Sequence, residues 1–364
     1  MITKQRWLMI LCALSTLLAA TLAGCSDDDP TENPVEATGT LEFFANGEDF
    51  IRQPFVSKDG WEIAFTGFYV NIHGPTAVQG EVEEEEADMQ VQVAYESSSE
   101  TSFRPAHAGH PVTGVSAGGD YVALEGDYLL DLHQTPEAPP EERTLVGTIA
   151  RKDTFDNPVL TGNYNTINFS LKPVEFSSGQ YDGTCPAMTE EECEEAAQGM
   201  VADEMAYTIR MMGNATCDGD PICGAEETVG FDILLLPVLD GNPDESGLAW
   251  SSCAWVGDGQ PGLVTDNGTG NIEMTFHSDH VFGDVEADGE LNDFAPGFSP
   301  FAKLAIADPS CGPGEDRCLT ATEEDLYDGW FDLGDTDPEM EYVYGMLLYS
   351  LGTIGHCGEG HCLH

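Results

Sequence analysis

The chain has 364 residues, of which 12 are Lys or Arg and 66 are Asp or Glu, which gives a formal net charge of −54 at pH 7. This excess of acids excludes a nucleic-acid-binding protein and peripheral docking on anionic lipids, because both need clustered positive charges. With 40 Gly and 21 Pro, a coiled coil or an all-helical bundle is excluded as well. A hydrophobic content of 41% is enough for a packed core.

The N-terminus has the composition of a secretory signal peptide. Lys4 and Arg6 precede an apolar run from Trp7 to Ala23, an arrangement typical of exported proteins. The sequence Leu22-Ala23-Gly24-Cys25 resembles the lipobox of bacterial lipoproteins, and this resemblance implies that Cys25 is lipidated. An uncleaved transmembrane anchor is the alternative. Because Ser26 follows the cysteine, the resemblance also implies anchoring in the outer membrane, facing the periplasm or the cell surface.

Runs rich in β-branched and aromatic residues, separated by Gly, Asn, Asp and Pro, predict a mainly β fold. The runs lie at 39–50, 60–74, 89–98, 120–133, 143–151, 165–176, 205–213, 229–239, 247–257 and 270–279. Their number and punctuation favour an antiparallel β-sandwich. One helix is expected within the series, capped by Thr189 with Glu192 completing a capping box.

From about residue 285 the pattern becomes helical. Residues 298–307 and 340–355 have helical spacing of apolar residues. A helix is also expected from Glu323, with Thr320 as its cap and Glu323 completing a capping box. We therefore expect four segments, which are a signal peptide (1–24), a lipidated tether (25–38), a β-sandwich domain (39–285) and a small helical, disulfide-stapled C-terminal extension (286–364).

The cysteines indicate an oxidising compartment, in which disulfides form. Eight of the nine cysteines that follow Cys25 form four local pairs in sequence, and Cys253 is the ninth. Spacing does not fix connectivity, so the eight are disulfide candidates only. They are Cys185, Cys193, Cys217, Cys223, Cys311, Cys318, Cys357 and Cys362.

Two short motifs concentrate histidine with acidic residues. The first holds His277, Asp279 and His280, and the second, at the C-terminus, holds His356 and His361. Neutral imidazole is a common ligand of transition metals. We therefore expect the C-terminal extension to return to the sandwich, so that these five side chains bind one divalent transition metal, with zinc or copper as the first expectation. On a strand, His277 and Asp279 would share a face. A buried, hydrogen-bonded histidine cluster is the alternative.

The same motifs carry a second resemblance. As they stand here they read His277-Ser-Asp279-His280-Val-Phe282 and Gly355-His356-Cys357-Gly358-Glu359-Gly360-His361-Cys362. They are similar to motifs of uncharacterised lipoproteins of deltaproteobacterial type, over roughly residues 40–75 and 270–362. The resemblance implies a surface location and brings no established activity.

Acidic loops match calcium-binding loops in part. Asp284, Glu286 and Asp288 occupy the first, third and fifth positions of such a loop and are possible calcium ligands, although the twelfth position is Ala295. The loop 308–319 lacks oxygen ligands at its third and fifth positions, so a disulfide between its cysteines is expected to close it instead. An unrelated disulfide-stapled helical hairpin is the alternative there.

Enzymatic function has little support in the sequence, and no catalytic residue is assigned. Ser116 lies in a G-x-S-x-G pattern, but a strand rather than a helix is expected to follow it.

Taken together, the lipobox and the histidine motifs lead us to expect an outer-membrane lipoprotein that binds a divalent transition metal. The alternative is a structural or interaction module with cell-surface protein partners, in which the Cys and His clusters only stabilise the fold.

Overall fold

The computed structural model of the chain describes residues 37–79, 121–133, 143–236, 249–254, 262–285, 294–334, 337, 340 and 342–357, with the backbone alone for 249–254, 356 and 357. The signal peptide, most of the tether with Cys25, and the strand expected at 89–98 lie outside these residues. Within the described part of the chain, no helix is both long enough and apolar enough to cross a membrane.

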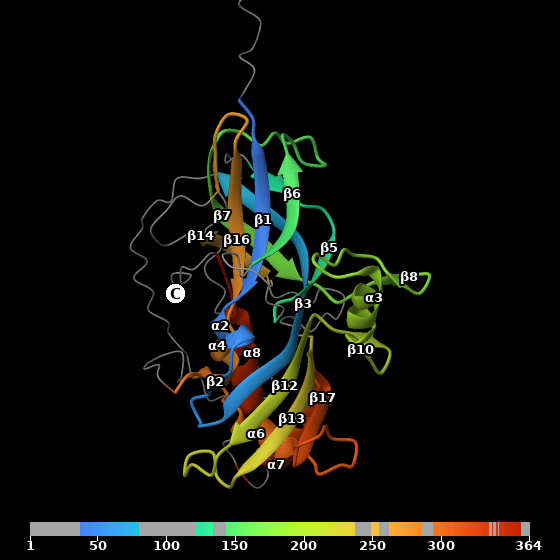
Figure 1. The fold of residues 1–364 in the computed structure, drawn as a ribbon, viewed down its shortest axis with the longest axis vertical. Coiled ribbons are helices and arrows are strands. Elements are labelled where there is room, and N and C mark those ends of the chain that lie inside the picture. Colours follow the sequence, from blue (N-terminus) through green and yellow to red (C-terminus); the bar gives the residue numbers. More distant parts are fainter. Residues whose placement is uncertain are drawn as a thin grey trace, which may run out of the picture. The chain divides into compact units, whose positions relative to one another are not determined.

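The predicted mainly β fold is confirmed, with two principal sheets in the described residues (Figure 1). The larger sheet has the order β14 (Ala249–Ala254), β7 (Gly162–Leu171), β3 (Glu62–Gln79), β12 (Ile209–Cys217), β13 (Glu227–Leu235) and β17 (Arg317–Thr322). Four short strands also pair with this sheet. Strand β15 (Leu263–Val264) pairs with β7, and three strands pair with β3, namely β2 (Phe55–Val56), β4 (Tyr121–Ala123) and β5 (Asp127–Asp131). The smaller sheet has the order β18 (Gly355–Cys357), β16 (Thr269–Phe276), β1 (Thr40–Gly47) and β6 (Thr144–Ala150).

The long strand β3 organises the larger sheet. One of its edges pairs first with β12 and then with β7, whereas its other edge pairs with β2, β5 and β4. The pairing with β7 is interrupted by a bulge between His73 and Thr76. Gly74 lies in this bulge with φ of +53°, a backbone conformation that glycine adopts without steric cost. The bulge lets β3 change partners without losing its ladder.

Among the strands that the structure describes, two pairs are parallel and the others are antiparallel. The pair β1–β16 joins segments more than two hundred residues apart, with Gly47 opposite Phe276. The pair β13–β17 has Leu234 opposite Thr322. Parallel neighbours need long crossover connections, so these pairs bring together parts of the chain that are distant in sequence. The first pair places the end of β1 beside the histidine motif that follows β16.

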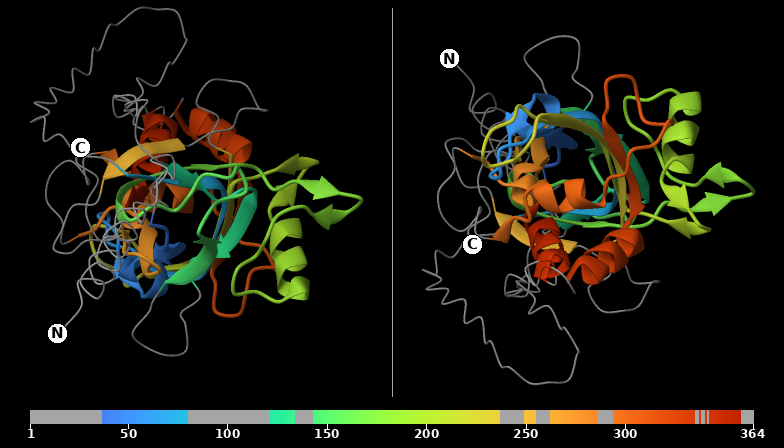
Figure 2. Two further views of the ribbon diagram at one scale, coloured as in Figure 1. Left: turned by 90° about the horizontal axis from the view of Figure 1, so that it is seen from above. Right: turned by 90° about the horizontal axis from the view of Figure 1, so that it is seen from below.

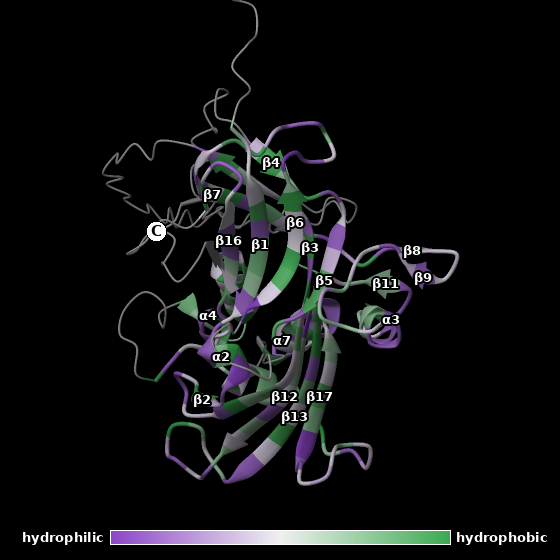
Figure 3. Cartoon of the chain, turned by 45° about the horizontal axis from the view of Figure 1, so that its top comes forward, coloured by the Kyte–Doolittle hydropathy of each residue, from purple (hydrophilic) through white to green (hydrophobic). Residues whose placement is uncertain are grey.

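A continuous hydrophobic cluster joins the two sheets and the helices. Between the sheets, the rings of Phe169 and Phe276 lie 5.7 Å apart. Against the other half of the larger sheet, the rings of Phe231, Phe282 and Phe298 lie between 5.5 and 6.3 Å from one another. Burying each such side chain contributes about 1.5–3 kcal/mol. Along β12 every second residue is buried and the residues between are half-buried, which is the pattern of a strand with one face on this core. Both hydrophobic and hydrophilic residues occur along the strands (Figure 3).

The helices in the described part of the chain are short and lie mostly near the C-terminus. They are α2 (Asp49–Arg52), α3 (Glu190–Gln198), α4 (Asp279–Phe282), α6 (Ser299–Leu304), α7 (Glu323–Gly334) and α8 (Val343–Thr353). The capping box of Thr189 and Glu192 on α3 is confirmed, with both of its hydrogen bonds present. The cap predicted for α7 is wrong, because β17 runs through Thr320 as far as Thr322 in pairing with β13. Thr322 instead exchanges hydrogen bonds with Asp325.

A small excursion after β7 carries α3 and two short hairpins, β8 (Phe176–Ser177) with β9 (Gln180–Tyr181), and β10 (Val201–Ala202) with β11 (Met205–Ala206). It stands to one side of the sheets (Figure 2). The disulfide Cys185–Cys193 joins its first turn to α3. Its own small cluster, around Tyr181 and Met200, packs on Leu129 of β5.

Three of the predicted local disulfides are confirmed, Cys185–Cys193, Cys217–Cys223 and Cys311–Cys318. Cys362 and the side chain of Cys357 lie outside the described residues, as does the side chain of Cys253. The disulfide Cys311–Cys318 closes the loop 308–319 as expected. A strand, β17, follows that loop, so neither a calcium-loop helix pair nor a helical hairpin forms there. Residues beyond 285 thus supply two strands, β17 and β18, beside the predicted helices.

Candidate metal centre

The histidine motif lies where β16 ends and the chain turns into α4. The last strand residue is Phe276, and the predicted strand at 270–279 therefore stops before Asp279, which begins the helix. The expectation that His277 and Asp279 share a face of a strand is wrong for this reason. Gly283, with φ of +70°, ends α4 after a single turn. This tight turn brings three potential ligands together within four residues.

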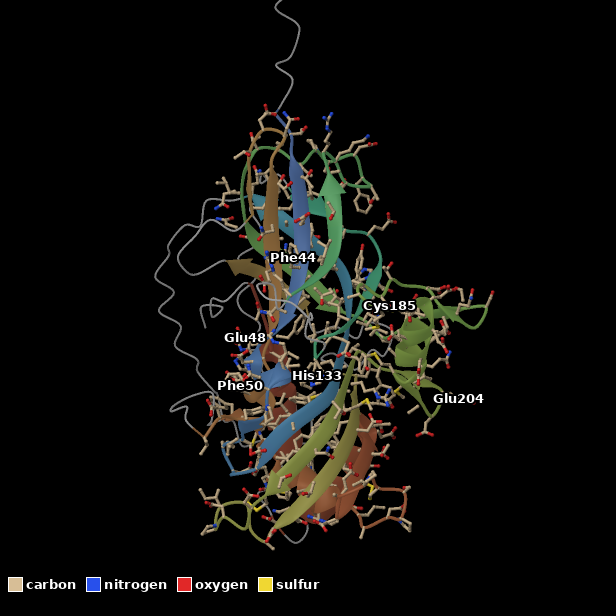
Figure 4. The ribbon with its side chains drawn as sticks, in the orientation of Figure 1. Phe44, Glu48, Phe50, His133, Cys185 and Glu204 are labelled. Carbon is tan, nitrogen blue, oxygen red and sulfur yellow. A yellow bond between two sulfur atoms is a disulfide. The ribbon has the colours of Figure 1, made fainter. Side chains whose placement is uncertain are left out.

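Two backbone-anchored contacts fix this turn to its neighbours. The amide of His277 donates to the carbonyl of Ile354, the residue before β18, over 2.9 Å. The hydroxyl of Ser278 donates to the carbonyl of Phe50 over 2.8 Å. Figure 4 shows Phe50 and Glu48 beside each other at the end of β1. The turn is therefore held between β1 on one side and the C-terminal segment on the other.

His277 faces a carboxylate from β1. Its Nδ1 lies 3.1 Å from Oε2 of Glu48, the residue that follows the parallel pair of Gly47 with Phe276. A hydrogen bond from Nδ1–H to Glu48 leaves Nε2 of the neutral ring as the nitrogen with a lone pair. Carboxylates orient metal-binding histidines in this way.

His280 is fixed by α8. Its Nδ1 lies 2.9 Å from the hydroxyl oxygen of Thr353, and that hydroxyl gives its own proton to the carbonyl of Ser350 over 2.8 Å. The threonine oxygen must therefore accept, and Nδ1 of His280 must donate. The neutral ring then carries its lone pair on Nε2. The rings of His277 and His280 stack, with centroids 5.1 Å apart and an angle of 24° between their planes.

Asp279 supplies a buried carboxylate beside the two rings. Among the described residues, its Oδ1 has no hydrogen-bond partner although it is shielded from solvent. Nδ1 of His277 lies 3.7 Å from this oxygen, which is too long for a hydrogen bond. Burial favours the neutral acid, but the neighbouring His277 side chain and the charges of His280 and His277 outweigh it and lower the pKa of Asp279. A buried carboxylate oxygen without a donor is the kind of group that an ion or water satisfies.

The three side chains can converge on one ion. They present ligand atoms that all lie within 4.8 Å of one another, and all three residues are buried. Metal–nitrogen and metal–oxygen bonds of about 2.0–2.2 Å place the ligand atoms of one ion about 3–4 Å apart. Small side-chain movements would therefore close the group around a metal. We call His277, Asp279 and His280 the central triad.

A second grouping, Cys311, Glu315 and Cys318, is also close enough to hold a metal. Its two sulfur atoms are joined in a disulfide, and a disulfide sulfur is not a thiolate ligand. The Glu315 carboxylate accepts a hydrogen bond from the amide of Gly312 over 2.7 Å. We therefore read this grouping as a stapled turn.

The structure describes only some of the other predicted ligands. The backbone of His356 pairs with Thr275, two residues before His277, whereas its side chain and His361 lie outside the described residues. Glu286 and Asp288 also lie outside them, while Asp284 follows α4 and is half-buried. Sequence reasoning missed Glu48 and Thr353, because the parallel pairing of β1 with β16 and the docking of α8 leave no local signal.

No protein-family model, curated protein sequence or solved structure is significantly similar to this chain. The chemistry of the central triad and its neighbours is therefore the basis for a functional proposal.

Proposed function

We propose that this chain is a lipid-anchored protein of the bacterial outer membrane that binds one divalent transition metal through His277, Asp279 and His280. The buried Oδ1 of Asp279, without a donor among the described residues and next to two imidazoles, is the observation that carries the proposal. Two nitrogens and one oxygen suit zinc, copper, nickel or iron, whereas calcium and magnesium prefer oxygen ligands throughout. Zinc or copper remains our first expectation.

The neighbours of the triad support the same chemistry. Glu48 and Thr353 each accept from Nδ1 of one histidine, which would direct Nε2 of both rings to a metal. The charges also balance, because a divalent ion would be matched by the carboxylates of Asp279 and Glu48. Such matching is required for ions buried away from water.

The C-terminal histidines are candidates for the fourth ligand. The pairing of β18 with β16 brings the backbone of His356 next to the strand that leads into the triad. A ligand from this segment would close the coordination sphere, as in a binding or structural site. A water in its place would leave the open position that metal-dependent hydrolysis needs.

The test is metal analysis of residues 26–364, purified without a histidine tag and reconstituted separately with zinc, copper and cobalt. We expect about one metal per chain, lost in His277→Ala, His280→Ala and Asp279→Asn. His73→Ala is the matched control, because His73 pairs with Asp127 on another strand and should leave the metal content unchanged. In the cobalt form, the visible absorption of a nitrogen-ligated ion should disappear with each triad variant and persist in the control.

A second set of variants separates ligands from orienting groups. Thr353→Val and Glu48→Gln should weaken metal affinity about 10–100-fold without abolishing it. His356→Ala and His361→Ala should change the cobalt spectrum only if one of them is a ligand. Wild-type protein that stays folded and binds no transition metal after reconstitution would overturn the proposal.

A structural role is the second candidate, and one observation favours it. The turn at the triad is tied to Phe50 and Glu48 near β1, and to Thr353 and Ile354 near the C-terminus. In that case the His cluster would lock three segments together. Stripping the metal with a chelator distinguishes the two, because a binding protein keeps its fold without the metal and a structural site loses it.

A further inference from the structure

A second cluster of chemically complementary side chains crosses three adjacent strands of the larger sheet, away from the central triad. His73 on β3 is directly opposite Asp127 on β5 and directly opposite Ser170 on β7. Residues opposite each other on neighbouring strands present their side chains on the same face of the sheet, with Cβ atoms about 4.5–5.5 Å apart. The ladder therefore sets an Asp, a His and a Ser in one row.

The first half of this row is already hydrogen-bonded. Nδ1 of His73 contacts Oδ1 of Asp127 at short range. Since an ionised carboxylate can only accept, Nδ1 carries the proton and Nε2 of the neutral ring carries the lone pair. The two ring nitrogens point in different directions, so the contact with Asp127 leaves Nε2 available to another partner, and Ser170 is the residue opposite His73 on the other neighbouring strand. This is the arrangement of a histidine that acts as a general base.

The second pair in the row is His73 with Ser170. Among the described residues, neither Nε2 of His73 nor the hydroxyl of Ser170 has a hydrogen-bond partner, and both residues are partly exposed. The two groups are not yet bonded to each other in this conformation. Catalytic hydrogen bonds are often long or absent before substrate binds, and the strand register places the two residues directly opposite each other.

The backbone around His73 supports a site rather than an ordinary ladder position. The bulge between His73 and Thr76 follows directly, and bulges re-aim side chains next to active sites. Gly126, beside Asp127, has φ of +104°, and a Cβ placed on it would meet no atom within 4 Å. There is thus open space beside Gly126, the residue that precedes Asp127.

The position of the row is fixed by a buried network two residues away on β3. Asn71 donates to the carbonyls of Lys172 and Pro173 over 2.9 and 3.2 Å, which ties the end of β7 to β3. Tyr181 in turn donates to Oδ1 of Asn71 over 2.6 Å. The segment that carries Ser170 is therefore held against the strand that carries His73, as a preorganised site requires.

We propose that Ser170, His73 and Asp127 form a second functional site, in which Ser170 is a nucleophile towards uncharged acyl esters. Ser170 Oγ would bond to the ester carbonyl carbon while its proton passes to Nε2 of His73. Collapse of the tetrahedral intermediate breaks the bond to the alkoxy group, which leaves with that proton as the alcohol. Water, deprotonated by His73, then attacks the acyl-enzyme and releases the acid, and Ser170 recovers its proton. The net charge of −54 disfavours anionic substrates.

The test is labelling with an uncharged fluorophosphonate probe, which phosphonylates activated serines, followed by peptide mass spectrometry on residues 26–364. We expect one labelled peptide, containing Ser170. The label should be absent in Ser170→Ala, and labelling should be at least tenfold slower in His73→Ala. Ser177→Ala is the matched control, because Ser177 is an exposed serine bonded to Asp182, and it should label at the wild-type rate.

Asp127 acts through His73 as a positioning residue, so its variant needs a kinetic readout. In Asp127→Asn the labelling rate should fall at least tenfold while long incubation still modifies Ser170 and the thermal midpoint stays near that of the wild type. No label on Ser170 in folded wild-type protein would overturn the proposal. Equal labelling rates in the wild type and in folded His73→Ala would overturn it too, because Ser170 would then react without the histidine. Neither outcome bears on the central triad, which shares no residue with this row.

Discussion

Glu323, the first residue of α7, is a buried carboxyl group that neither proposed site uses. It is 8% exposed. Its Oε2 accepts a hydrogen bond from the amide of Leu236 over 2.8 Å, and its Oε1 accepts one from the hydroxyl of Tyr344. Burial raises the pKa of Glu323 to about 7, although both hydrogen bonds act to lower it. Burial and the Glu323 carboxylate raise the pKa of Tyr344, so that tyrosine remains a donor.

Protein stability should fall as the pH rises through the range set by Glu323. Below about 4.5 the carboxyl is protonated in both states, so it contributes no pH dependence. Between 4.5 and about 7 the unfolded chain releases the proton while the folded chain keeps it, so the free energy of unfolding decreases with pH. The decrease attributable to this residue is about 3 kcal/mol over that range. Above about 7 both states are ionised and the decrease stops.

The measurement is urea unfolding at pH 5 and pH 8 for the wild type and for Glu323→Gln. The amide cannot ionise but can keep one hydrogen bond to each neighbour, so the variant should lose less stability than the wild type between the two pH values. Glu324→Gln, an exposed neighbour on the same helix, is the control and should follow the wild type. Parallel pH profiles for wild type and Glu323→Gln would contradict the prediction.

At the scale of the element, the start of α7 allows the observed cap, Thr322, to be compared with the cap predicted from the sequence, Thr320. Thr322 accepts from the amide of Asp325 over 3.2 Å, while its own amide and hydroxyl donate to that aspartate over 2.8 and 2.7 Å. Thr322→Ala should therefore reduce the free energy of unfolding by about 1 kcal/mol. Thr320→Ala should change it by less than about 0.5 kcal/mol, since that exposed side chain makes no cap. Urea unfolding of both variants checks this. If both variants lost the same free energy of unfolding, Thr320 would stabilise the helix start as much as Thr322, which would contradict the prediction.

The helix starts show which elements the sequence can predict. At α3, the threonine and glutamate of the capping box stand in a polar segment without competing strand pairing, so the local signal decides the structure. At α7, the helix starts at Glu323 as predicted, but Thr320 of the matching pattern is drawn into β17 by parallel pairing with β13, and the cap lies two residues later, at Thr322. Local capping energies of about 1 kcal/mol yield to a strand ladder that also buries Leu319 and Ala321.

The candidate site was predictable to the same extent. His277, Asp279 and His280 lie within four residues of one another, so their grouping could be predicted from this local motif. Glu48 and Thr353 complete the site from opposite ends of the chain, and only the pairing of β1 with β16 and the docking of α8 bring them there. The row of Ser170, His73 and Asp127 depends equally on strand register. The sequence motif thus indicated the candidate ligands, whereas their neighbours Glu48 and Thr353 could be identified only from the topology.

At the scale of the whole molecule, the unbalanced charge should dominate the response to salt. Even if each of the 12 cationic side chains neutralised one carboxylate, 54 carboxylates would remain. Close pairs such as Arg210 with Asp232 and Arg317 with Glu227 therefore offset only a small part of the repulsion within the folded state. Screening shortens the reach of that repulsion from about 30 Å at 0.01 M salt to about 3 Å at 1 M.

The thermal midpoint should consequently rise with NaCl, most steeply below about 0.3 M, where the screening length changes fastest. The measurement is thermal unfolding of residues 26–364 from 0.01 to 1 M NaCl, with a chelator present so that the metal binding proposed for the central triad does not contribute. A specific effect of sodium is separated by repeating the series with KCl, which should give the same curve. The compact folded state brings these carboxylates close together, so their repulsion should lower its stability at low salt. A thermal midpoint that stays constant or falls across the low-salt range would show that the carboxylates are not repelling one another in the folded protein.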